Sequence, residues 1–133
     1  MTATTEGRNT PRRLGCTLSV VVHADAVLYA GTLVTLLAAS GKAVAGGTAS
    51  AGPVVGVATE TITGDGSTAT ELERGIFQFA NSASGDLIAK ADIGATCYVV
   101  DNQTVAKTDN SAARKAAGKS LDVDAGGVWV AIG

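Results

Sequence analysis

The segment "LDVDAGGVWVAIG", Leu121 to Gly133, predicts a strand, a tight turn and a second strand. Side chains alternate along a strand, so the second strand should present three aliphatic residues on one face, Val128, Val130 and Ile132. Trp129 and Ala131 then point to the other face. No charged residue follows Asp124, so we expect this apolar end to be held in a sheet or an interface.

Trp129 is the only tryptophan and has two possible positions. It could cap the end of a small barrel, or it could lie at a subunit interface, where tryptophan is enriched. We favour the interface because the chain has few other aromatic anchors and no charged residue closely flanks Trp129.

Strand patterns continue outward from this hairpin. "ATCYVVDNQTVAKT", residues 95–108, predicts another hairpin with its turn at Asp101-Asn102. In residues 70–82, alternation places Ile76 and Gln78 on one side and Phe77 and Phe79 on the other. Residues 17–22, 27–37 and 53–63 are rich in β-branched residues, with Pro53 at the first strand position. Only "SASGDLIAKADIG" has helical character, of about one turn, and "DNSAARKAAGKS" is a loop or a short helix.

These signals predict an all-β protein: one small β-barrel or β-sandwich domain over residues 16–133, without internal repeats. A chain of 133 residues fits one domain. Aromatic residues are only 4%, so the core should consist of Val, Leu, Ile and Ala. Charged residues are 17% with a net charge of -2, which argues against nucleic-acid binding and fits a subunit packed against others.

Residues 1–15 form a separate, polar N-terminal arm. It is rich in threonine, contains Pro11 and has no hydrophobic periodicity, so alone it should be disordered. Arg8, Arg12 and Arg13 make the arm basic beside an acidic body. We expect the arm to extend from the domain and to become ordered on a partner, with these arginines at the interface.

Two segments imitate targeting signals. In "RRLGCTLSVVV" the apolar run follows Cys16, whereas in a secretory signal it precedes the cleavage site. "AVLYAGTLVTLLAASG", residues 26–41, is too short and too rich in glycine and threonine to span a bilayer. We expect no membrane partner.

Cys16 and Cys97 form no CxxC pattern and are predicted to be reduced and partly buried. A disulfide bond between these two cysteines remains an alternative.

No set of residues predicts catalysis. "AGKS" ends like a phosphate-binding loop, but Ala113 stands where that motif requires glycine. His23 and Asp25, two residues apart on one side of a strand, lack a marked nucleophile, so His23 is read as a surface or interface residue. One carboxylate, Asp65, does not make a calcium loop. We therefore expect no enzyme activity, cofactor or metal.

Residues 20–133 resemble the capsid cement, or head-decoration, proteins of tailed bacteriophages. The matching residues are Gly94, Tyr98, Val99, Asp101, Val105, Ala117-Gly118 and the hairpin Val123 to Ile132. The resemblance implies a viral structural protein that binds the outer surface of an icosahedral capsid and stabilises it. It implies synthesis in the bacterial cytoplasm, the major capsid protein as partner, and assembly as a homotrimer at three-fold positions.

Two other functions stay open. One is a receptor- or glycan-binding β-sandwich of a virion, against which the scarcity of aromatic residues counts. The other is a nucleotide-handling enzyme that uses "AGKS".

Overall fold

The computed structural model describes residues 2–3, 5–9 and 15–133. Within them the protein is all-β, as predicted, and its helical parts are two three-residue 3-10 turns, η1 (Ser84–Asp86) and η2 (Lys90–Asp92). The strands are β1 (Thr17–Val21), β2 (Val27–Leu28), β3 (Leu33–Leu37), β4 (Ala43–Ala45), β5 (Ala51–Ala58), β6 (Ile62–Thr63), β7 (Ala69–Glu73), β8 (Gly75–Asn81), β9 (Thr96–Val99), β10 (Thr104–Ala106), β11 (Ala116–Asp124) and β12 (Gly127–Ile132).

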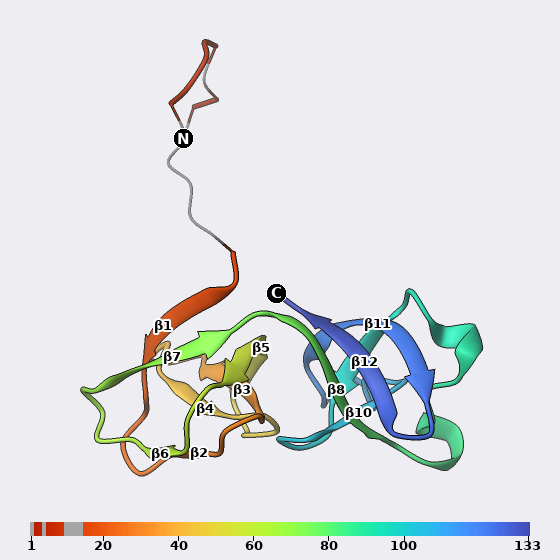
Figure 1. Cartoon of the computed structure of the whole chain (residues 1–133). Helices are drawn as coiled ribbons and strands as arrows, with labels where there is room; N and C mark the ends of the chain where they lie inside the picture. Colours follow the sequence, from red (N-terminus) through yellow and green to blue (C-terminus); the bar gives the residue numbers. More distant parts are fainter. Residues whose placement is uncertain (1, 4, 10–14) are drawn as a thin grey trace.

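The strands form a sheet and a barrel that lie side by side (Figure 1). The sheet has the order β1-β7-β5-β3-β4, and the closed barrel has the order β10-β8-β12-β11-β9. A short ribbon of β2 and β6 accompanies the sheet. Arg74 alone separates β7 from β8, so the chain passes almost without interruption from the sheet into the barrel.

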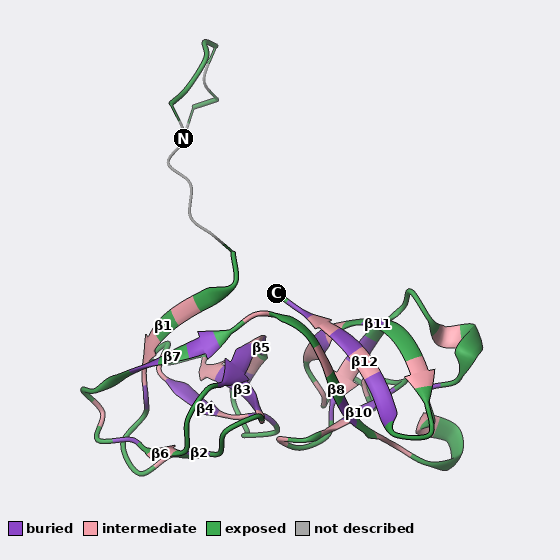
Figure 2. Ribbon diagram, viewed as in Figure 1, coloured by how far each residue is buried: buried purple, intermediate pink, exposed green. Residues whose placement is uncertain are grey.

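Two buried clusters hold these parts together, and buried residues run along β5 and β12 (Figure 2). The first cluster fills the barrel and includes Phe79, Val128 and Val130. Leu33 and Val57, from the sheet, belong to the same cluster, so one face of the sheet packs against the barrel. The second cluster joins the other face of the sheet to the ribbon through Val22, Leu28, Val34, Ala43, Ala58 and Leu72.

The predicted hairpins and their alternation are confirmed. β11 and β12 are antiparallel around Ala125-Gly126, and β9 pairs with β10 around the turn that contains Asp101. Val128, Val130 and Ile132 are buried, as is Phe79 on the neighbouring strand. Their partners on the other face are more exposed: Trp129 and Ala131 are half-buried, and Ile76 is 61% exposed.

Arg74 connects the C-terminal end to the sheet. Its backbone N–H donates to the Cys16 carbonyl at 2.8 Å, and its Nε donates to the Val55 carbonyl at 3.3 Å. A Cβ built on Gly133 would come within 2.8 Å of the Arg74 side chain, so the chain end lies against it. The apolar end is thus held both by β12 in the barrel and by this junction.

Three local expectations are wrong. Pro53 is the third residue of β5, not the first. It is exposed at a point where β5 does not pair with β7, so the N–H that proline lacks has no partner strand to bind there. His23 and Asp25 lie in a turn after β1, not on a strand, and Asp25 has φ of 65°. Cys16 is exposed rather than partly buried; Cys97 is buried, and both are free thiols.

The described part of the arm, residues 2–3 and 5–9, is exposed and lies apart from the sheet and the barrel (Figure 1).

Candidate interaction surface

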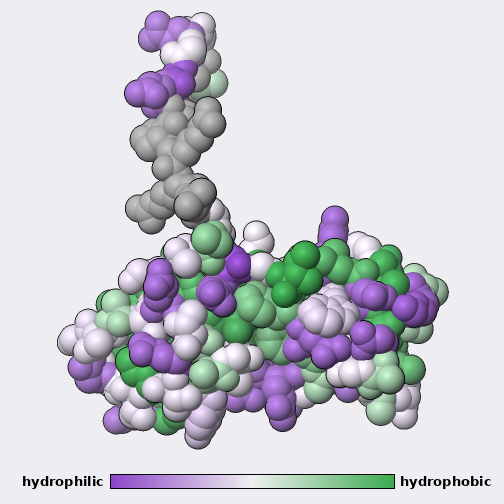
Figure 3. All heavy atoms as spheres, in the orientation of Figure 1, coloured by the Kyte–Doolittle hydropathy of each residue, from purple (hydrophilic) through white to green (hydrophobic). Residues whose placement is uncertain are grey.

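The outer side of the barrel carries a set of apolar side chains on β8, β12 and β11. Ile76 is paired with Ala131, and Trp129 lies between Gln78 on β8 and Asp122 on β11. The register shifts between Ser120 and Asp122, and Leu121 at this shift is 39% exposed. We call this surface the Trp129 face and define it by Ile76, Leu121, Trp129 and Ala131. Figure 3 shows strongly hydrophobic side chains gathered over these strands.

Trp129 is held in place by Asp124, which lies on the other strand of the hairpin. The indole Nε1 donates to Oδ2 of Asp124 at 3.0 Å. Gln78 Nε2 donates to Oδ1 of the same carboxylate at 3.0 Å, and the Gly126 N–H donates to it at 2.8 Å. A buried or interfacial indole N–H needs such a partner. Because the ring is already oriented, less side-chain entropy remains to be lost on binding.

Charged groups surround the apolar residues. The hydrogen bond from Trp129 is the main cause that holds the pKa of Asp124 below its usual value. The pKa of Asp122 is also lowered, mainly by its hydrogen bond with Lys90, whose Nζ lies 2.9 Å away. This ion pair is exposed and contributes little stability. An apolar centre with a polar rim is the usual arrangement of a protein interface.

Of the four predicted interface residues, the structure describes two, Arg8 and Trp129, and it does not bring these two together. Arg8 is exposed in the arm, away from the Trp129 face, and Arg12 and Arg13 lie outside the described residues. Trp129 belongs to neither buried cluster and lies on the outside of the barrel. Its role at a subunit interface, and that of the arginines, stay predictions.

Sequence reasoning did not identify Ile76 and Leu121 as members of this surface. Ile76 could have been found from the sequence, because the two-residue alternation places it on the strand face opposite to that of Phe77 and Phe79. Leu121 could not be found in this way, since the irregularity in β11 turns both Leu121 and Asp122 outward. A register shift breaks the two-residue period on which the prediction depends.

The segment "AGKS" does not form a phosphate-binding loop. Gly118 and Lys119 lie inside β11 rather than in a loop before a helix. Burial raises the pKa of the Cys97 thiol. The described residues contain no group of three or more His, Cys, Asp or Glu side chains that could hold a metal ion. None of their helices has the length and apolar character needed to cross a membrane.

Searches against protein-family models, curated proteins and solved structures found no match to this chain.

Proposed function

We propose that this chain is a structural protein of a tailed-bacteriophage virion. It binds the outer surface of the capsid as a homotrimer and stabilises the contacts between capsomers. The capsid assignment depends on the resemblance of residues 20–133 to head-decoration proteins.

The observation that best supports a role in assembly is the Trp129 face. Ile76 and Leu121 leave apolar surface in water, and Trp129 between them has a fixed orientation. Association would remove this surface from water, at about 25 cal/mol per Å² of apolar area buried. Tryptophan anchors of this kind often carry a large part of the binding free energy at interfaces. We assign the Trp129 face to the contact between copies of the chain.

The arm has a different role in this proposal. Its basic residues, Arg8, Arg12 and Arg13, would contact the major capsid protein and become ordered there, adding contact area at the cost of conformational entropy. The capsid contact and the contact between copies are therefore separable.

Sedimentation velocity tests the contact between copies. The full chain should sediment as a trimer, and Trp129→Ala should sediment as a monomer that keeps a β-type circular dichroism spectrum. Tyr29→Ala is the matched control, because Tyr29 is a 53% exposed aromatic residue outside the barrel. A Trp129→Ala protein that remains trimeric would remove the Trp129 face from the proposal.

Co-sedimentation with undecorated capsids tests the function itself. The full chain should sediment with capsids and raise the temperature at which they break open. A chain without residues 1–15 should stay folded and trimeric but bind capsids more weakly. If the full chain binds no capsid but binds a glycan array, the receptor-binding alternative replaces this function.

A further inference from the structure

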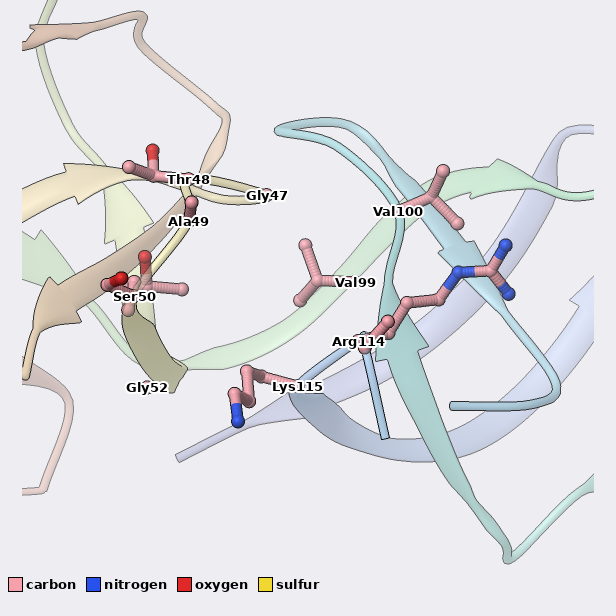
Figure 4. Close-up of a pocket in the computed structure, with 12 residues that line it drawn as sticks. Gly47, Thr48, Ala49, Ser50, Gly52, Val99, Val100, Arg114 and Lys115 are labelled. Atoms are coloured by element: carbon pink, nitrogen blue, oxygen red, sulfur yellow. The ribbon is translucent and has the colours of Figure 1, made fainter. Parts of the chain in front are cut away.

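A cavity of about 260 Å³ lies between the sheet and the barrel (Figure 4). One wall is formed by residues 47–52, which comprise the end of the turn after β4 and the first two residues of β5. The opposite wall consists of Val99, Val100 and residues 113–115, which precede β11. Typical small-molecule sites occupy roughly 300–1,000 Å³, so this cavity suits a single side-chain group or a small ion. We call it the Lys115 cavity.

The lining of the Lys115 cavity has two cationic side chains and no acidic one. Arg114 is already paired: its Nη1 lies 3.3 Å from an Asp86 oxygen and donates to the Thr108 carbonyl at 3.2 Å. In Figure 4 the Arg114 guanidinium points away from the turn, whereas Lys115 extends toward Gly52. Within the described residues Lys115 makes no ion pair. Lys115 is an exposed residue, and no acidic side chain of the cavity lining offsets its positive charge.

The hydroxyl groups of the lining differ in what they already bind. Thr48 and Thr35 both donate to the Ala45 carbonyl, at 2.6 and 3.4 Å. The Ser50 hydroxyl makes no hydrogen bond with any described residue. The Ser50 hydroxyl and the Lys115 ammonium, on opposite walls of the cavity, are thus hydrogen-bond donors that bind no acceptor among the described residues.

Unusual backbone conformations gather on both sides of the cavity. Among the described residues, six that are not glycine have positive φ, and four of them flank this cavity. Ser50 has φ of 60° on one wall; residues 110–112 have φ of 50°, 57° and 70° just before the other. Consecutive left-handed residues other than glycine are rare, and such strain is concentrated at ligand-binding sites.

We propose that the Lys115 cavity binds a single oxyanion group, a carboxylate or a phosphate. Lys115 Nζ forms the ion pair, and the Ser50 hydroxyl donates from the opposite wall. Two sources present this chemistry: an acidic side chain of a partner protein and free inorganic phosphate. The inference does not depend on the proposed function, because it uses neither the Trp129 face nor the arm.

Titration of the full-length ¹⁵N-labelled chain tests the site. The probes are inorganic phosphate and N-acetyl-glutamate N-methylamide, each compared with sodium chloride at equal ionic strength. We expect one probe to shift the amide signals of Ser50 and Lys115 in a saturable way. Saturation by phosphate alone assigns the free ion, and saturation by the glutamate compound assigns a partner's carboxylate. Shifts no larger than those from sodium chloride would overturn the proposal.

Matched variants locate the binding. Lys115→Gln should raise the dissociation constant at least about tenfold, whereas Lys119→Gln, an exposed lysine on β11 outside the cavity lining, should change it less than about twofold. Ser50→Gly removes the hydroxyl while glycine accepts the positive φ, so this variant should stay folded and bind more weakly. Equal binding by Lys115→Gln and the unchanged chain would overturn the assignment.

Discussion

The barrel and the sheet satisfy their backbone hydrogen bonds in different ways. In the barrel, β8 pairs with β12 on one side and with β10 on the other, so the ring closes and has no free edge. In the sheet, β1 and β4 are the outer strands, linked to each other only by the single bridge between Val22, just after β1, and Ala43. Strand β5 pairs with β7 only at Val57 and Ala58. Beyond that point Pro53 is exposed and Arg74 binds the Val55 carbonyl. Proline and charged side chains on an edge discourage unwanted strand pairing.

The two regions also differ in what they bury. The barrel cluster contains Phe79, the one aromatic residue that is buried among the described residues. It extends into the sheet through Leu33 and Val57. The cluster on the far side of the sheet is aliphatic. We therefore expect truncations in the barrel cluster to cost more stability than truncations in the sheet cluster. The predictions below test this difference, from the largest expected effect to the smallest.

Phe79→Ala should produce the largest loss of stability. Phe79 is 5% exposed at the centre of the barrel cluster, and such truncations cost about 3–5 kcal/mol. Urea denaturation followed by circular dichroism measures the free energy of unfolding. Tyr29→Ala, an exposed aromatic position, serves as control and should change it by less than about 0.5 kcal/mol. A loss for Phe79→Ala no larger than for the control would mean that the barrel core does not dominate stability.

Leu72→Ala tests whether the sheet unfolds together with the barrel. Leu72 is fully buried in the second cluster, and its truncation should cost about 2–5 kcal/mol. Because the sheet contributes to the barrel cluster, Trp129 fluorescence from the barrel and circular dichroism from the whole chain should follow one transition. If the circular dichroism changes first and the fluorescence later, the two regions are independent units.

Gly118→Ala should destabilise the barrel by steric overlap. A Cβ at Gly118 would lie 2.1 Å from the Ala131 carbonyl oxygen, so β11 and β12 would have to move apart. Overpacking of this kind costs about 1–3 kcal/mol. Gly85→Ala is the control, since a Cβ there meets nothing within 4 Å. Thermal unfolding compares the two, and equal melting temperatures would contradict the close approach of these strands.

The free energy of unfolding should fall at acid pH as the carboxylate of Asp65 becomes protonated. Hydrogen bonds from the Thr68 hydroxyl and the Thr68 and Ser67 amides lower the pKa of Asp65 from 3.8 to about 2. Because the folded pKa is the lower one, the stabilisation is present above pH 3.8 and is lost as pH falls through about 2. NMR titration of the Asp65 carboxyl group should give a midpoint near 2. A midpoint at the ordinary value would show that this turn does not form as described.

The smallest effect is a difference in reactivity between the two thiols. Cys16, at the start of the sheet region, is exposed, whereas Cys97 is buried in the barrel, where burial raises the pKa of its thiol. Iodoacetamide should therefore modify Cys16 in the folded protein and reach Cys97 only after unfolding. Mass spectrometry of the two peptides gives the result, with the denatured protein as control. Equal labelling in the folded state would indicate that the barrel opens readily.

Sequence reasoning located the hairpins and the inward faces but not the surface as a whole. Glycine turns and two-residue alternation identified β12 and the positions of Phe77 and Phe79, because these signals are local. The Asp124 partner of Trp129 could be suggested by its nearness in the hairpin, but Gln78 reaches the same carboxylate only because β8 lies beside β12. The Lys115 cavity joins segments more than 60 residues apart and left no sequence pattern.

By itself, the sequence determined the class of structure. Segments rich in β-branched residues, glycine turns and two-residue alternation specify which segments are extended and which side chains point inward. These signals can be read from sequence because backbone stereochemistry acts between near neighbours. Only the tertiary structure decided which strands pair. The parallel contact of β10 with β8 closes the barrel, and the sharing of Leu33 and Val57 joins the sheet to it. These contacts form between segments that are distant in the sequence. They depend on how well the side chains of those segments pack together in the complete core.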